Sequence, residues 1–274
     1  MNDTPKLRSG APVPTPADIT ANWLTEVLQN AGYSAAQVIS FDAADVGTGQ
    51  VGRCIRYTLN LDATADARAP RSLVAKFTSD DPVSRQTGKD MKTYLTETHF
   101  YQQIAPRVQI SVPRCYYANI DAEGLNHLIV MEDMAPGVQG DQIAGCSIDE
   151  AKAGVIELAR LHRQFWNEPQ LHKLEWIRPR MPLPPNTFEP LDEWLKAFLP
   201  AEQYNIVKLA TPRIHEWLAL TPANTTLIHV DCRADNLLFN HDTPTSPSAY
   251  LIDFALVSVG DAVADVAYLL TSSL

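Results

Sequence analysis

The sequence lacks the features that mark membrane, secreted or nucleic-acid-binding proteins. No uninterrupted apolar run approaches the length that spans a bilayer, and the N-terminal residues lack the apolar core of a secretion signal. The four cysteines lie far apart and form no C-x-x-C pair, which argues against a zinc site and favours reduced thiols in a cytoplasmic protein. A net charge of -10 gives no basic excess for nucleic acid or an anionic membrane, so we expect neither as a partner.

The N-terminal half contains mainly strand-like patterns. With 274 residues the chain is long enough for two lobes, each with its own core. Short apolar or alternating runs recur between residues 37 and 131, separated by polar turns, so residues 17–134 are predicted to form a lobe with a five-stranded antiparallel sheet. Residues 1–16, rich in Pro, Thr and Ser, are expected to form a flexible N-terminus, followed by a helix from Pro16 to about Asn30.

The C-terminal half has a mainly helical pattern. The stretch Glu132–Gly137 interrupts the strands and predicts a lobe boundary. The segment Ser147–Glu150 has the S-x-x-E pattern of a capping box and begins an amphipathic helix, and two more helices are expected over residues 189–220. We therefore expect residues 135–274 to form a second, mainly helical lobe, which makes the fold class α+β.

One segment of the second lobe has the residues of a phosphoryl-transfer site. The pattern H-x-D-x-x-x-x-N runs from His229 through Asp231 to Asn236, and Asp253 follows a short apolar strand further on. This is the order and spacing that a kinase-type site requires. Asp231 is predicted to act as the catalytic base that accepts the proton of a hydroxyl group. Asn236 and Asp253 are predicted to hold Mg²⁺ on the phosphates of ATP, because oxygen ligands suit a hard cation. For Asp231 and Asp253 the alternative is a carboxylate that only stabilises a turn.

A glycine-rich loop lies between two predicted strands of the first lobe. Gly47, Gly49 and Gly52 precede an alternating run that begins at Cys54, so the loop joins strand to strand. A dinucleotide-binding G-x-G-x-x-G must instead open a helix. We expect the backbone of this hairpin to close over nucleotide phosphates, although a plain hairpin turn has the same pattern.

Together these motifs resemble those of the kinase-like small-molecule phosphotransferases, which include aminoglycoside phosphotransferases, choline kinases and ecdysteroid kinase-like enzymes. The resemblance covers roughly residues 35–270. The segments that carry it are Val46–Gly52, Leu73–Phe77, Glu97, Ile129–Asp133, His229–Asn236 and Gly260–Ala267. The resemblance implies a bilobal protein-kinase-like fold that binds ATP and Mg²⁺ between its lobes. It also implies transfer of the γ-phosphoryl group of ATP to a hydroxyl of a small molecule.

The resemblance implies roles for residues of the first lobe as well. Lys76 would neutralise the α- and β-phosphates and pair with a helix acid, for which Glu97 is the candidate. The connector from Glu132 to Met134 would meet adenine through its backbone. Lys76 and Glu97 also fit ordinary solvated positions on a strand and a helix, so both interpretations stay open here.

Several residues around the catalytic loop are expected to support it. His229 would hold the loop through a hydrogen bond to the backbone. Asp261 and Asp265 would brace it, with Asp261 also a candidate for contact with the substrate. Arg233 and Asp235 fit either a contact with the substrate or a loop-bracing role.

Two features depart from the pattern of the family. Val230 occupies the middle of H-x-D, where Gly is usual, and a β-branched residue there disfavours a positive φ. The sequence also ends at Leu274, soon after the helix that carries Asp265, where relatives continue with further helices. We expect either a truncated chain or a more open acceptor pocket, with exposed apolar surface that favours a homodimer.

The acceptor is expected to be a small molecule with a hydroxyl group. The subfamily resemblance favours a steroid-like or other apolar alcohol, and the acidic net charge favours an amino alcohol or aminoglycoside. A nucleotide-binding pseudokinase or a truncated non-catalytic module is the alternative. The early end of the sequence favours it, and it is opposed by the joint presence of Lys76, Asp231, Asn236 and Asp253. A protein kinase is disfavoured because no A-P-E segment follows Asp253.

Overall fold

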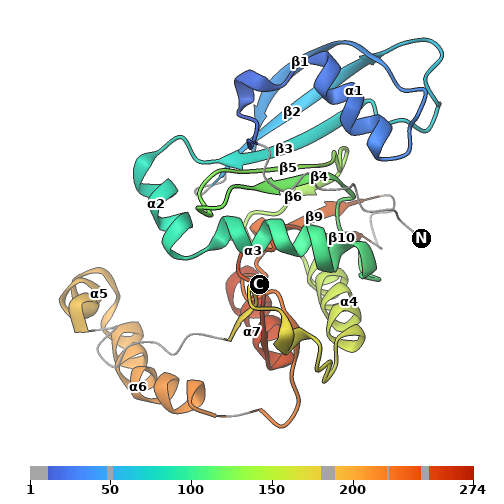
Figure 1. Ribbon diagram of the computed structural model, residues 1–274. Coiled ribbons are helices and arrows are strands. Elements are labelled where there is room, and N and C mark those ends of the chain that lie inside the picture. Colours follow the sequence, from blue (N-terminus) through green and yellow to red (C-terminus); the bar gives the residue numbers. More distant parts are fainter. Residues whose placement is uncertain (1–11, 48–51, 180–188, 221, 242–246) are drawn as a thin grey trace.

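The computed structural model describes residues 12–47, 52–179, 189–220, 222–241 and 247–274, which form an α+β structure with two lobes (Figure 1). One antiparallel sheet with flanking helices makes the upper lobe in this view. Helices and two small sheets make the lower lobe. The predicted fold class, with a five-stranded antiparallel sheet, is confirmed.

The upper sheet has the strand order β1-β2-β3-β5-β4, and every neighbouring pair is antiparallel. Its strands are β1 (Val38–Val46), β2 (Gly52–Leu61), β3 (Ser72–Thr78), β4 (Cys115–Ile120) and β5 (His127–Glu132). The glycine-rich segment thus lies between two paired strands, as predicted. The register of β2 and β3 places Cys54 opposite Lys76, which brings the start of β2 close to this lysine.

The predicted N-terminal helix is two elements. Asp18 accepts hydrogen bonds from the backbone and hydroxyl of Thr15 and closes one 3-10 turn, η1 (Pro16–Asp18). The helix α1 (Ala21–Asn30) begins only after Thr20, whose hydroxyl accepts from the backbone N–H of Trp23 at 3.2 Å. The prediction of one continuous helix was therefore wrong, because a second N-capping residue restarts it. The predicted flexible N-terminus falls mostly on residues 1–11, which lie outside the described residues.

Successive side chains of β5 point to opposite faces of the upper sheet, as in any β-strand. Leu128 and Val130 belong to the buried cluster that contains α1, whereas Ile129 and Met131 belong to the cluster that continues into the lower lobe. The helical elements between β3 and β4 are α2 (Pro82–Asp90), α3 (Thr93–His99), the π-helical turn η2 (Phe100–Ile104) and η3 (Ala105–Arg107). The second face of the sheet therefore faces the lower lobe.

The lower lobe combines helices with short strands. Ser147 and Glu150 form the predicted capping box at the start of α4. The strands form two three-stranded sheets, in the orders β10-β9-β6 and β7-β11-β8. The described elements are β6 (Val138–Gln139), α4 (Ile148–Gln164), η4 (Leu171–Lys173), β7 (Arg178–Pro179), η5 (Glu189–Leu191), α5 (Asp192–Phe198), α6 (Ala201–Leu218), β8 (Thr226–Ile228), η6 (Ala234–Asn236), β9 (Leu237–Asn240), β10 (Ser248–Leu251), β11 (Ser258–Gly260) and α7 (Ala262–Ser273).

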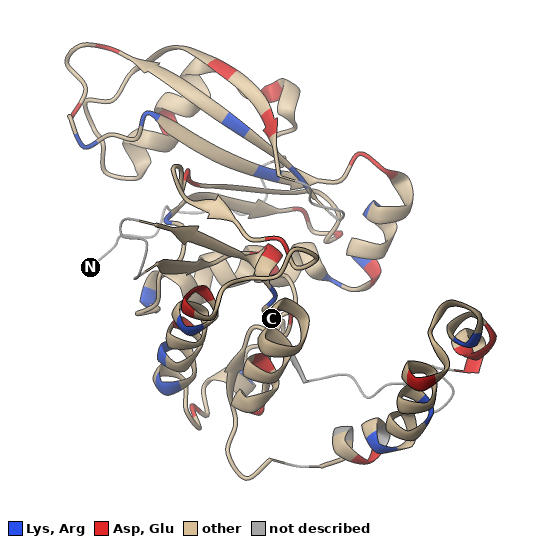
Figure 2. Cartoon of the chain, turned by 180° about the vertical axis from the view of Figure 1, so that it is seen from behind, with Lys and Arg blue, Asp and Glu red and all other residues tan. Residues whose placement is uncertain are grey.

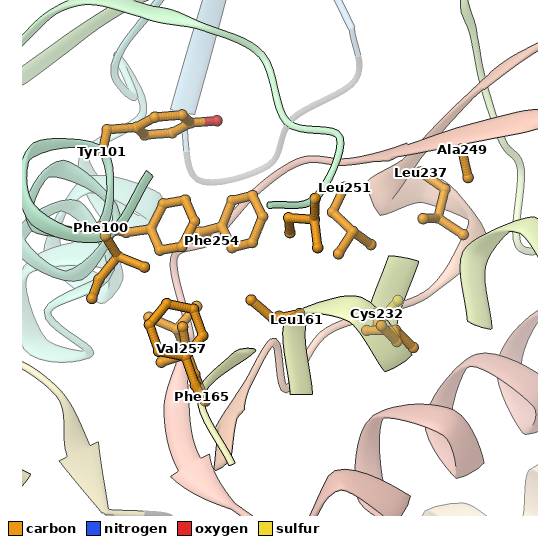
Figure 3. Close-up of a cluster of buried hydrophobic side chains, with 14 of the residues drawn as sticks. Phe100, Tyr101, Leu161, Phe165, Cys232, Leu237, Ala249, Leu251, Phe254 and Val257 are labelled. Carbon is orange, nitrogen blue, oxygen red and sulfur yellow. The ribbon is translucent and has the colours of Figure 1, made fainter. Parts of the chain in front are cut away.

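A buried aromatic contact joins the two lobes. The rings of Phe100 and Phe254 stack with centroids 3.7 Å apart and an angle of 6° between their planes (Figure 3). Phe100 extends α3, and Phe254 directly follows Asp253. Both rings are fully buried in the same cluster as Leu161 and Phe165 of the α4 region. This packing fixes the loop after β10 against the upper lobe.

Charges of both signs are spread over the molecule. Figure 2 shows blue and red segments together on α4 and on α6, and the sequence of α4 contains three acidic and three basic residues besides its histidine. In the part of the chain that the structure describes, no helix has the length and apolar character needed to cross a membrane.

Candidate active site

A cavity of about 450 Å³ is lined by residues of both lobes. It gathers nine of the ten residues that the sequence assigns to catalysis, nucleotide binding or metal binding. The nine are Gly47, Gly52, Lys76, Glu97, Glu132, Met134, Asp231, Asn236 and Asp253. The tenth, Gly49, lies outside the described residues. Residues from distant parts of the sequence, such as Gly47 and Asp253, therefore meet at one place.

Lys76 lies between two carboxylates from different elements. Its Nζ atom is 2.8 Å from Oε2 and 2.9 Å from Oε1 of Glu97 on α3, and 3.2 Å from Oδ1 of Asp253. The side chain of Glu97 is buried and that of Lys76 is 15% exposed, whereas that of Asp253 is 40% exposed. The ammonium group is thus held in the cavity next to the loop that carries Asp253.

Burial and the mutual contacts of these three groups set their protonation. Burial raises the pKa of Glu97 to about 7, against the opposing effect of Lys76. Burial alone would lower the pKa of Lys76, but Asp253 and Glu97 together raise it well above its usual value. Burial would raise the pKa of Asp253, and Lys76 lowers it below its ordinary value. The cavity therefore contains a permanent cation beside an ionised Asp253.

Two described glycines of the glycine-rich segment are needed for different reasons, Gly47 for its backbone conformation and Gly52 for its close approach to Lys76. Gly47 has a φ of 76°, a conformation that L side chains rarely adopt. A Cβ atom on Gly52 would lie 3.1 Å from Cε of Lys76 and 3.2 Å from the carbonyl oxygen of Phe77. A side chain at position 52 on β2 would therefore be too close to the side chain of Lys76 on the neighbouring strand β3.

Asp231 is held by its own loop. The side-chain nitrogen of Asn236 donates to the backbone oxygen of Asp231 at 2.8 Å and to its Oδ2 at 2.9 Å. Because the nitrogen of this amide is used in both bonds, its oxygen is the atom available to a further partner. Nε of Arg233 lies 3.5 Å from Oδ1 of Asp231, which is longer than a normal hydrogen bond.

Arg233 and Asp235 both line the cavity; Arg233 directly precedes the turn η6, and Asp235 lies within it. Nη1 of Arg233 donates to Oε1 of Gln142 at 3.1 Å, and Oδ1 of Asp235 accepts the backbone N–H of Gln142 at 2.9 Å. Nε of Arg233 is buried and has no hydrogen-bond partner within the described part of the chain. The two residues thus link the catalytic loop to the segment after β6, and both remain in reach of a ligand.

The backbone of the loop is braced from α7, as predicted for Asp265. Its fully buried carboxylate accepts the N–H groups of His229 and Val230, each at 2.8 Å, and contacts Nε2 of His162 at 2.8 Å. The ring of His229 bonds the carbonyl oxygen of Ile252 at 2.9 Å, which agrees with the predicted structural role.

Asp261, the other predicted brace, caps α7. Its Oδ1 atom accepts the backbone N–H of Val263 at 3.0 Å. The capping role explains an acid at this position without a substrate.

The structure places Val230 where its residue type is disfavoured. The φ of Val230 is 74°, and that of Asp253 is 62°. We expected the β-branched side chain to keep φ negative, and this was wrong. The bond from the N–H of Val230 to Asp265 holds the left-handed conformation, so the loop adopts the geometry usual for glycine at the cost of strain.

We expect Val230→Gly to stabilise the fold by up to about 1 kcal/mol. The left-handed conformation costs a residue with a Cβ atom about 1–2 kcal/mol, and the entropy of glycine in the unfolded chain offsets part of that gain. The free energy of unfolding in urea measures the change. Val259→Gly in β11, where φ is not positive, is the control and should lose stability. Equal losses for both variants would show that position 230 stores no strain.

Sequence analysis missed other residues that line the cavity, among them Arg56, Met91 and Tyr101. Arg56 follows Gly52 and Cys54 at intervals of two along β2, so strand periodicity could have placed it on the same face. The helix α2 was also missed. Its signal was present, because Asp81 accepts the N–H of Ser84 at 2.7 Å and Pro82 occupies the first helical position.

Comparison with known proteins agrees with this geometry. The model of the phosphotransferase enzyme family (APH) matches residues 66–274, which is more than half of the chain. The GDP and kanamycin complex of APH(2")-IIia has a TM-score of 0.57 at 18% identity and covers 90% of this chain and 77% of its own. The GDP complex of wild-type aminoglycoside 2'-phosphotransferase-IIIa has a TM-score of 0.52 at 16% identity, with 93% and 79% covered.

At these identities the two solved structures show a shared bilobal, kinase-like fold. No curated protein sequence matches the chain. The family assignment therefore rests on the family model, whose match includes Lys76, the catalytic-loop motif and Asp253. On that match, this chain belongs to the phosphotransferase enzyme family.

Proposed function

We propose that this protein transfers the γ-phosphoryl group of ATP to a hydroxyl group of a small molecule. One observation carries the proposal: a single cavity unites a buried lysine–glutamate pair, a carboxylate–amide pair and a further carboxylate on a braced loop. These are the groups that phosphoryl transfer uses, with a fixed cation for the phosphates and a base for the acceptor. Residues 17–134 and 135–274 would form the two lobes around the nucleotide.

The nucleotide would bind along the upper side of the cavity. Lys76 would neutralise the α- and β-phosphates, and Glu97 at 2.8 Å holds its ammonium group in place. The glycine-rich hairpin would cover the phosphates with its backbone N–H groups. The backbone of the connector from Glu132 to Met134, whose residues also line the cavity, would meet the base.

Asn236 and Asp253 are suited to hold Mg²⁺. Asn236 offers its amide oxygen, because the amide nitrogen donates to Asp231. The pKa of Asp253 is lowered by Lys76, whose Nζ atom lies 3.2 Å from its Oδ1 atom. An amide oxygen and a carboxylate are the hard ligands that Mg²⁺ prefers, and the ion would neutralise charge on the phosphate oxygens. Within the described residues no group of three or more His, Cys, Asp or Glu side chains could hold a metal ion.

Asp231 would act on the acceptor. Its carboxylate would take the proton of the acceptor hydroxyl while the hydroxyl oxygen forms a bond to the γ-phosphorus. The bond from that phosphorus to the bridging oxygen breaks, and ADP leaves with the electron pair. No covalent enzyme intermediate is needed, so positioning and electrostatics would supply the catalysis.

The acceptor class is the finer part of the proposal. One similar structure contains kanamycin, which supports a polyhydroxylated amine among the candidates. The subfamily resemblance of the sequence supports an apolar alcohol instead. A panel with both classes is therefore needed.

The test is ADP release with MgATP and with MgGTP across sterols, amino alcohols and aminoglycosides. We expect release that depends on one acceptor class and stops when EDTA removes Mg²⁺, because Asp253 and Asn236 would hold the ion that neutralises the phosphates. Binding of MgATP with no release for any acceptor would contradict the proposal and favour a nucleotide-binding protein without turnover. Full activity in EDTA would contradict the metal assignment alone.

A further inference from the structure

The connector between the lobes is tied to the upper sheet by one buried carboxylate. Asp133 follows β5 on the connector, and its side chain is only 6% exposed. Oδ2 accepts from Nε of Arg56 at 2.7 Å and Oδ1 accepts from Nη2 of Arg56 at 3.0 Å. The hydroxyl of Ser72 and the backbone N–H of Ala135 at 3.2 Å also donate to this carboxylate. Four donors fill the acceptor capacity of the group.

The partners of Asp133 come from elements that surround the nucleotide end of the cavity. Arg56 lies on β2, four residues after Gly52, and Ser72 begins β3, the strand that carries Lys76. Arg56 and Asp133 themselves line the cavity. The carboxylate thus sets the position of the connector relative to the two strands that cover the nucleotide.

The pair stays charged in the folded protein. Burial alone would raise the pKa of Asp133, but the bonds from Arg56 and Ser72 lower it below its ordinary value. An arginine–carboxylate pair with two parallel bonds is stronger and more directional than a single contact. The connector is therefore held in one geometry before any ligand binds.

We propose that Arg56 and Asp133 are positioning residues for the nucleobase, which hold the connector so that its backbone is already arranged to receive the base. This inference rests on the proposed nucleotide binding. A backbone segment that must be ordered on binding lowers affinity, and preorganisation removes that cost. We expect the effect to be confined to the nucleoside part of the ligand, because Lys76 would hold the phosphates.

The experiment compares two ligands that differ only in the nucleoside. Calorimetry would measure the Kd of MgATP and of Mg²⁺-tripolyphosphate for wild type, Arg56→Gln and Asp133→Asn. We expect both variants to weaken MgATP about tenfold, with little change for tripolyphosphate. The double variant should bind MgATP no worse than either single variant, because both remove the same contact. Arg56→Lys keeps the charge without the paired geometry and should restore part of the affinity.

Arg53→Gln is a matched control on the same strand. Its side chain is 39% exposed, as is that of Arg56, but it pairs with the exposed residues Asp45 and Asp80, outside the cavity lining. It should leave the Kd of both ligands unchanged, because exposed ion pairs contribute little.

The outcomes separate the inference from the proposed function. Equal weakening of MgATP and tripolyphosphate in Arg56→Gln would overturn the inference, since a general loss of structure would explain it. Unchanged binding of MgATP in both variants would also overturn it while leaving the proposed function intact. No binding of MgATP by the wild type would overturn both together.

Discussion

Asp231→Asn should lower kcat for the best acceptor by about 10²–10⁴-fold, the range that loss of a positioned general base causes. The substitution keeps the size of the side chain and an oxygen that can still accept the bond from Asn236, which is 2.9 Å long in the wild type. What it removes is the basicity needed to take the proton of the acceptor. The Kd of MgATP should therefore stay close to that of the wild type, and single-turnover measurements would place the loss in the chemical step.

The matched control for this variant is Asp235→Asn in the same loop. Asp235 also lines the cavity, but its Oδ1 already accepts the backbone N–H of Gln142 at 2.9 Å. We expect a loss of kcat well below that of Asp231→Asn. If the two variants lose equal activity, or if Asp231→Asn keeps wild-type kcat, the assignment of the base is wrong.

The residues of the catalytic-loop motif could be predicted because residues that lie close together in the sequence also contact one another in the structure. Asp231 and Asn236 are five residues apart, and one amide group spans that turn by bonding both the backbone and the side chain of Asp231. The strand that precedes Asp253 carries it to the same cavity. Local geometry of this kind is specified by a few consecutive residues, so a single sequence is enough to find it.

The pair formed by Arg56 and Asp133 could not be predicted in this way. The two residues are 77 positions apart. Their contact depends on the strand order β2-β3-β5, in which β5 lies beside β3 although β4 precedes it in the sequence. Neither arginine nor aspartate has a sequence preference that would indicate this contact. Charge pairing across a sheet becomes visible only once the register is known.

Val230 shows the opposite error, in which a correct local preference is overruled. A β-branched residue disfavours a positive φ, yet two backbone N–H groups bonded to Asp265 hold this loop in that conformation. The carboxylate that imposes the strain lies 35 residues further along the chain. Here the tertiary hydrogen bonds to Asp265, and not the local preference of valine, determine the backbone conformation.

Asp265→Asn should destabilise the fold by about 3–5 kcal/mol, the cost of removing one partner from a buried charged network. The fully buried carboxylate takes three contacts of 2.8 Å, from the backbones of His229 and Val230 and from the ring of His162. An amide at this position offers one oxygen in place of two, so its NH₂ group must face a backbone N–H. Urea unfolding followed by circular dichroism would measure the loss.

Two further substitutions turn this expectation into an ordered series. His162→Gln removes the ring but leaves both backbone bonds of Asp265, so it should cost less than Asp265→Asn. Asp261→Asn, on the same helix, keeps a capping oxygen for the N–H of Val263 and should change the free energy of unfolding by a few tenths of a kcal/mol at most. Because Asp265 holds the backbone of the catalytic loop, kcat should fall in the same order as stability, most in Asp265→Asn and least in Asp261→Asn. If Asp265→Asn were no worse than Asp261→Asn, the loop would have to be held by the bond of His229 to Ile252 and by the packing of Phe254.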